Sequence, residues 1–311
     1  MRRFALSATC IGRIFVASIS TRPLPPINSD RGALAADTAA ESSGLRQRVL
    51  AAVVFVPVIL LLVEGASWGI FLLVLAVAAR CSWEYHHILA EAGYRPIRLP
   101  GSLLVLGLCS YFWRQGTGDD LTALLMAAIL LVVVWTLFQG TERYAANAFL
   151  TLGGVLFFGI LGSAPLLLFQ AAGRGEEAHH LVAVLFLCIW LTDSGAYFSG
   201  RFWGRAKLAP AISPNKTRIG CIGGVVGSAL PIPLGFLLPS FSPASLLGLL
   251  LVAGIGAQVG DLVESAFKRD MGIKDAPMLI PGHGGLLDRF DSYFLAFPLA
   301  YLYVDVLAVF S

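Results

Sequence analysis

The sequence predicts an all-α protein that crosses a membrane many times, and three observations carry this prediction. Of the 311 residues, 57% are hydrophobic and only 13% are charged, about half of the roughly 25% that is usual in soluble domains. The mean hydropathy is +0.78. From Val49 onward, apolar runs recur that approach the roughly 20 residues of a membrane helix. A water-soluble enzyme is therefore excluded. A net charge of only +3, without a continuous basic stripe, argues against a nucleic-acid partner.

Short polar or Pro/Gly breaks divide the apolar part into runs that predict about nine membrane-spanning helices. The runs cover residues 47–64, 67–82, 100–117, 121–138, 147–169, 180–199, 220–238, 244–263 and 292–310. A bundle surrounded by lipid is not subject to the size limits of soluble cores. We therefore expect one integral membrane domain over residues 46–311.

Residues 1–45 differ from the rest of the chain. Their arginines are interspersed with Ser and Ala, the first acidic residue is Asp30, and the sequence LPPIN interrupts any helix. This composition is similar to that of an organelle transit peptide. The alternative interpretation, a disordered extension or an upstream start codon, accounts for it slightly better. We expect a disordered or targeting-like leader.

The positions of Lys and Arg predict how the helices are oriented. With the leader on the cytoplasmic side, the cytoplasmic segments after it hold fifteen Lys and Arg residues, whereas the opposite side holds only Arg114 and Arg174. This asymmetry is what the positive-inside rule expects, and it favours an odd number of crossings.

The first polar cluster ends the sixth predicted helix and continues into the loop after it. Asp193 and Tyr197 are four residues apart and share a helical face. Ser213, Lys216 and Thr217 follow in a loop between glycine-rich stretches. Small hydroxyl groups and a lysine on an extended turn suit phosphate oxygens.

The second cluster ends the eighth predicted helix. Asp261, Glu264, Ser265 and Lys268 have the spacing i, i+3, i+4 and i+7, so one face of an apolar helix carries them all. Glu264 and Lys268 also have the i, i+4 spacing of an ion pair that only supports a helix. For Glu264, this structural interpretation and a functional one weigh equally. The structural interpretation does not explain Asp261, which we expect to be functional.

The third cluster opens the ninth predicted helix. Asp288 and Asp291 lie three residues apart, with Arg289 between them, after a glycine-rich segment that contains His283. Two carboxylates so close together repel each other unless a cation lies between them. Mg²⁺ takes hard oxygen ligands and substrate phosphates, so we expect one or two metal ions here.

All three clusters are predicted at the cytoplasmic face. The sixth and eighth helices end there and the ninth begins there, which predicts a pocket with carboxylates for metal and cations for a polyanion. Phosphoryl or nucleotidyl transfer is the chemistry that such a pocket favours, because positioning and charge neutralisation carry most of its catalysis.

The stretch from Ser265 to Asp291, SAFKRDMGIKDAPMLIPGHGGLLDRFD, resembles the signature of phosphatidate cytidylyltransferases, also called CDP-diacylglycerol synthases. The matching positions are Ser265, Lys268, Arg269, Lys274, Asp275, Pro281, His283, Gly284, Gly285, Asp288, Arg289 and Asp291. The segment from Asp193 to Thr217 resembles the upstream conserved region of the same family. The resemblance covers roughly residues 46–311.

The resemblance implies a reaction of CTP with phosphatidic acid that yields CDP-diacylglycerol and pyrophosphate and requires Mg²⁺. It implies a lipid phosphate that attacks the α-phosphorus of CTP, without a side-chain nucleophile. Asp261 and Asp288 would be the principal metal ligands. Asp291 and Asp193 would be further ligands or supporting acids.

The predicted substrate-binding residues divide by chemistry. Lys216, Lys268 and Arg269 would neutralise the triphosphate or the lipid phosphate, and Lys268 counts with Asp261, Asp288 and Asp291 as catalytic. Three hydroxyl groups would donate hydrogen bonds, from Ser213, Thr217 and Ser265. The remaining predicted contacts are Asp193, Lys274, His283 and Arg289.

Two departures from the family pattern and several alternatives stay open. Pro277 stands where a small residue is expected, and Ile219 stands where members commonly carry Glu.

A related CTP-dependent transferase or kinase that acts on another lipid is the alternative enzyme, and a cation-coupled transporter is the alternative outside enzymes. A bacterial inner membrane is expected, an organelle membrane fits the leader, and a homodimer is compatible with the sequence.

Overall fold

The computed structural model describes residues 55–115, 118, 120–273, 285–307 and 309. All of them lie in one of the two units into which the chain divides, Ala51–Ser311. The expected leader, residues 1–45, lies outside the described residues.

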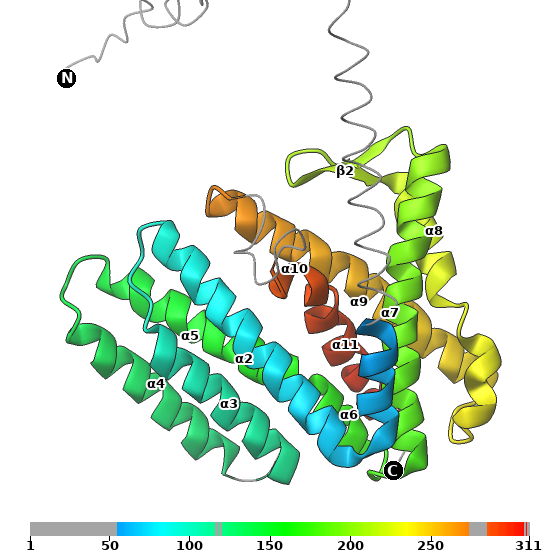
Figure 1. Ribbon diagram of the computed structural model, residues 1–311, viewed down its shortest axis with the longest axis horizontal. Helices are drawn as coiled ribbons and strands as arrows, with labels where there is room; N and C mark the ends of the chain where they lie inside the picture. Colours follow the sequence, from blue (N-terminus) through cyan, green and yellow to red (C-terminus); the bar gives the residue numbers. More distant parts are fainter. Residues whose placement is uncertain (1–54, 116–117, 119, 274–284, 308, 310–311) are drawn as a thin grey trace, which may run out of the picture. The chain divides into compact units, whose positions relative to one another are not determined.

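Helices make up most of the described chain, as predicted (Figure 1). A first helix, Phe55–Gly65, precedes the labelled elements. In chain order, these are α2 (Ser67–Glu91), α3 (Arg98–Gln115), α4 (Leu121–Leu137), α5 (Tyr144–Ile160), η1 (Leu161–Ser163), α6 (Ala164–Ala171), α7 (Glu176–Trp203), β1 (Lys207–Ala209), β2 (Ser213–Thr217), α8 (Arg218–Ser228), η2 (Ile232–Leu237), α9 (Pro243–Asp270), α10 (Leu287–Phe290) and α11 (Tyr293–Val306).

Within the part of the chain that the structure describes, five stretches are long and apolar enough to cross a membrane, so the predicted count of about nine is not confirmed. These stretches are α2, Tyr144–Ala171, α7, Arg218–Leu237 and α9. The helix Phe55–Gly65 and α4 are apolar but shorter. The run predicted over 292–310 contains α11, which has 14 residues.

The predicted helix 147–169 is interrupted by the 3₁₀ turn η1 between α5 and α6. Pro165 lies in the first turn of α6. Proline lacks the N–H of a helical hydrogen bond, and its ring clashes with the carbonyl one turn earlier. The interruption is therefore placed by the sequence itself.

The core lies where α2, α5, α6, α7, α9 and α11 meet, and aromatic rings fill much of it. Phe158 and Phe294 pack edge to face with ring centroids 5.0 Å apart. The buried Tyr293 donates its hydroxyl hydrogen bond to the carbonyl of Gly162, at 2.7 Å. This bond ties the start of α11 to η1, because a buried tyrosine hydroxyl needs a partner.

Glycines bring α7 and α8 into close contact. A Cβ atom at Gly195 would lie 2.5 Å from the carbonyl oxygen of Gly223 and 3.3 Å from the Cα of Gly227. Small residues let membrane helices approach until their backbones touch. This contact fixes α8 against α7 at the end of the bundle where the β-hairpin lies.

The loop between α7 and α8, predicted as an extended turn, contains a two-stranded antiparallel hairpin (Figure 1). Lys207 of β1 pairs with Thr217 of β2, and Ala209 pairs with Ser213. The all-α prediction therefore misses one short hairpin. Its strands of three and five residues connect α7 to α8 in the chain.

Candidate active site

The polar face predicted on α9 is present. Glu264 and Lys268 are buried, with 7% and 9% of their surface exposed, and Asp261 and Ser265 are half-buried. Ser265 donates a hydrogen bond to Asp261 Oδ1, at 3.4 Å. The face therefore presents two carboxylates and one ammonium group at the C-terminal end of an apolar helix.

Lys268 joins α9 to α10. Its Nζ lies 2.8 Å from Glu264 Oε2 and 2.7 Å from Asp288 Oδ1. The other oxygen of Asp288 accepts a hydrogen bond from the backbone N–H of Gly285, at 3.2 Å. Burial alone would raise the pKa of Asp288. Hydrogen bonding to Lys268 and Glu264 and the positive charge of Lys268 outweigh burial and lower this pKa below its ordinary value.

Lys216 joins the hairpin to α9. Its Nζ lies 2.7 Å from Asp261 Oδ2, and both side chains are partly exposed. A second contact runs from Arg269 Nε to the carbonyl oxygen of Ile212, at 3.4 Å. The structure thus places both the hairpin and α10 next to the end of α9 (Figure 1).

Asp291 lies against α9. A Cβ atom at Gly260 would be 2.6 Å from the carbonyl oxygen of Asp291, so only glycine permits this approach. Burial raises the pKa of Asp291 well above its ordinary value, and the charges of Asp261, Glu264 and Asp193 raise it further. The negative charge of the carboxylates around Asp291 therefore exceeds the positive charge of the neighbouring cations.

Asp193 lies on α7 and is exposed. The charges of Asp261, Asp291 and Lys216 interact with its carboxylate. Asp193 therefore belongs to the same electrostatic neighbourhood as the α9 face, and we find it at the edge of the cluster.

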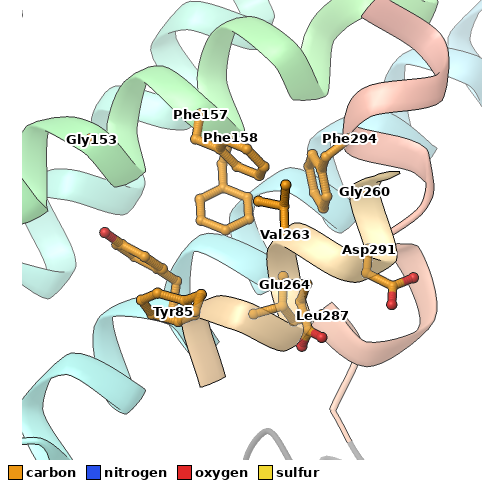
Figure 2. Close-up of a pocket in the computed structure, with 11 residues that line it drawn as sticks. Tyr85, Gly153, Phe157, Phe158, Gly260, Val263, Glu264, Leu287, Asp291 and Phe294 are labelled. Carbon is orange, nitrogen blue, oxygen red and sulfur yellow. The ribbon is translucent and has the colours of Figure 1, made fainter. Parts of the chain in front are cut away.

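An apolar pocket of about 270 Å³ adjoins this cluster. Figure 2 shows the rings of Phe157, Phe158 and Phe294 across the pocket from Glu264. The full lining consists of Tyr85, Gly153, Phe157, Phe158, Gly260, Val263, Glu264, Phe267, Leu287, Asp291 and Phe294. Two carboxylates thus border a cavity that is otherwise mostly aromatic and aliphatic.

The donor set fits a hard divalent cation, although the metal site is not assembled in the described part of the chain. No three His, Cys, Asp or Glu side chains there converge closely enough to hold a metal ion. Instead, Lys216 and Lys268 contact Asp261 and Asp288. Glu264 Oε1 is buried and has no hydrogen-bond partner among the described residues. An unsatisfied carboxylate oxygen among acids matches the oxygen ligands of Mg²⁺.

Comparison with known proteins identifies the family, because residues 46–307 match the sequence pattern of the cytidylyltransferase family. The chain belongs to the cytidylyltransferase family. It is 35% identical to a protein of Staphylococcus haemolyticus named phosphatidate cytidylyltransferase, over 81% of this chain and 94% of that protein. It is 34% identical to a Bacillus subtilis protein of the same name, over 86% of this chain and 99% of that protein.

The other predicted residues of this cytidylyltransferase are placed as follows. Thr217 is buried and its Oγ1 accepts a hydrogen bond from the N–H of Gly220, so it caps α8. Ser213 is half-buried in β2, and Arg269 and Arg289 are exposed. Ile219, at the position of the missing Glu, is exposed on α8. Lys274, His283 and Pro277 lie outside the described residues.

Sequence reasoning missed Glu84. The predicted span 67–82 ends before Glu84, but α2 continues to Glu91, and Glu84 and His86 are buried within it. The Glu84 carboxylate accepts hydrogen bonds from the backbone N–H groups of Leu286 and Leu287. A carboxylate on an otherwise apolar membrane helix was the available signal.

Proposed function

We propose that the chain is a phosphatidate cytidylyltransferase. It transfers the cytidylyl group of CTP to phosphatidate, giving CDP-diacylglycerol and pyrophosphate. The observation that carries the proposal is the lysine and carboxylate cluster beside an apolar pocket, in a chain of the cytidylyltransferase family. The cluster suits the phosphates of both substrates, and the pocket suits the apolar part of a lipid.

The reaction needs positioned charge rather than a side-chain nucleophile. An oxygen of the lipid phosphate attacks the α-phosphorus of CTP, and the bond from this phosphorus to the β-phosphate oxygen breaks. Lys216 and Lys268 supply positive charge beside Asp261 and Asp288, and Arg269 extends it to the exposed rim. Charge fixed where the pyrophosphate leaves lowers the barrier most effectively.

We assign Asp261, Asp288 and Asp291 as the residues that would hold Mg²⁺, and Glu264 as a further oxygen donor. Bound Mg²⁺ would neutralise phosphate charge in the transition state. Lys216 and Lys268 keep Asp261 and Asp288 oriented through ion pairs. Gly260 permits Asp291 to approach the same face.

The proposal includes a topology and a location. Four further helices, Phe55–Gly65, α3, α4 and α11, would complete nine crossings with the five longer stretches. The excess of Lys and Arg at the end of the bundle that carries the site supports a cytoplasmic active site.

The bacterial relatives support an inner membrane. A second copy of the chain is compatible with this arrangement, and the mass of the protein in detergent decides between monomer and homodimer.

The test supplies the purified full chain with labelled CTP and either phosphatidate or a lipid alcohol. We expect labelled CDP-diacylglycerol and equimolar pyrophosphate with phosphatidate and Mg²⁺, and loss of both products with EDTA. Restoration by added Mg²⁺ is the control for irreversible damage. Transfer of phosphate to the lipid alcohol would instead assign a CTP-dependent lipid kinase, and absence of turnover with either lipid would contradict the proposal.

A further inference from the structure

Glu84 is a buried carboxylate far from the active-site residues in sequence. It lies on α2 with 1% of its surface exposed. Its Oε1 accepts a hydrogen bond from Leu286 N at 3.1 Å, and its Oε2 accepts one from Leu287 N at 2.8 Å. Arg80 Nε, one turn earlier on α2, lies 3.0 Å from Oε1 and balances the charge.

The segment that Glu84 holds is too short to fix its own position. α10 has four residues, and its N-cap residue, Leu286, provides no side-chain cap. A single helical turn is unfavourable in isolation, because many dihedral angles are fixed for one hydrogen bond. The first N–H groups of the turn also need acceptors from outside it. Glu84 provides two of these acceptors from a different helix.

The same turn carries Asp288. Three consecutive N–H groups, of Gly285, Leu286 and Leu287, donate to two carboxylates: the first to Asp288 and the other two to Glu84. On its other side, Asp288 contacts Lys268 of α9. The Asp288 carboxylate is thus oriented from two sides. The side chain of Asp288 contacts α9, and the backbone of the turn that carries Asp288 is bonded to α2.

We infer that Glu84 is a positioning residue for the proposed reaction: it anchors the α10 turn to α2 and so holds Asp288 at the α9 cluster. This inference rests on the proposed function, since Asp288 must act in that reaction for its position to matter. Displacement of a reacting group by about 1 Å can lower a rate by about 100-fold. A carboxylate with two fixed amide donors prevents such a displacement.

The test compares Glu84→Ala and Glu84→Gln with Glu91→Ala in the full chain in detergent. Glu91 is on the same helix, is exposed, and pairs with His87 rather than with α10. We expect Glu84→Ala to lower kcat by about 100-fold with little change in KM for CTP. Glu84→Gln keeps one acceptor oxygen in the same volume, so it should retain intermediate activity. Glu91→Ala should match the wild type.

Hydrogen exchange supplies the second readout and does not depend on turnover. The amides of Leu286 and Leu287 should exchange faster in Glu84→Ala, whereas those of α7 should be unchanged. Unchanged kcat in both Glu84 variants, or unchanged local exchange, would overturn the inference. A loss of activity that only follows a general loss of folded protein would also overturn it. The Gln variant, which is isosteric with Glu, decides whether this is the case. Failure of the wild type to form CDP-diacylglycerol would instead overturn the proposed function.

Discussion

Lys268 satisfies two carboxylates that come from separate parts of the chain. Its ammonium group contacts Glu264 on its own helix and Asp288 on α10, and all three side chains are largely shielded from solvent. Removing the lysine from such a buried group would leave uncompensated charge, at a cost of about 3–5 kcal/mol. Loss of Lys268 would therefore destabilise the fold as well as release Asp288.

We predict that Asp288→Ala abolishes CDP-diacylglycerol formation while the protein remains inserted in the membrane. The substitution removes a proposed metal ligand and the partner of Lys268, and the expected loss is about 100-fold or more. Asp305→Ala is the matched control, because Asp305 is exposed on α11 and lies outside the cluster. Product is measured in membranes with equal amounts of each variant. Retained activity in Asp288→Ala would remove this residue from the site.

The contact between α7 and α8 determines where the hairpin lies. Gly195 and Gly223 allow the two backbones to touch, and the hairpin spans the short connection between these helices. Lys216 reaches Asp261 from that hairpin. A change in the spacing of α7 and α8 would therefore be transmitted to the site, although neither glycine is part of it.

We predict that Gly195→Ala lowers both stability and activity. Its Cβ would meet the backbone carbonyl of Gly223 at 2.5 Å, which a backbone can relieve only by moving. The expected destabilisation is about 1–3 kcal/mol, measured as thermal unfolding in detergent. Gly107→Ala on α3 is the control, since nothing lies within 4 Å of its Cβ position. That variant should be at least as stable as the wild type, because alanine favours a helix. Equal stability of the two variants would contradict the packing argument.

The length of α7 relates the site to the two sides of the membrane. Its 28 residues correspond to about 42 Å of helix, more than the roughly 30 Å of a hydrocarbon core. Glu176 at one end and Arg205 just beyond the other are both exposed. The two residues should therefore lie on opposite sides, with Arg205 beside the hairpin.

We predict that a membrane-impermeant thiol reagent labels Glu176→Cys in intact bacterial cells, and labels Arg205→Cys only after the cells are opened. Cys10 and Cys221 are first replaced by Ser, because Cys81, Cys109 and Cys188 are buried. The parent chain with these two replacements is the control for background labelling. Labelling of Arg205→Cys in intact cells would reverse the proposed orientation.

The sequence by itself determined the helical membrane class and much of the candidate cluster. Spacing alone placed Asp261, Glu264, Ser265 and Lys268 on one helical face, since the helical period is fixed by backbone geometry. It also indicated that the hairpin segment and the Asp288 segment belong near that face. The structure places Lys216 and Asp288 in direct contact with it.

The tertiary structure decided which groups pair and which helices support them. The role of Glu84 depends on a contact between residues about 200 positions apart, and no local period encodes such a contact. The end of α2 at Glu91 was likewise missed, because burial of Glu84 against α10 lets a polar segment continue an apolar helix. Periodicity records which face of a helix is buried, whereas the partner of that face is chosen by packing across the whole bundle.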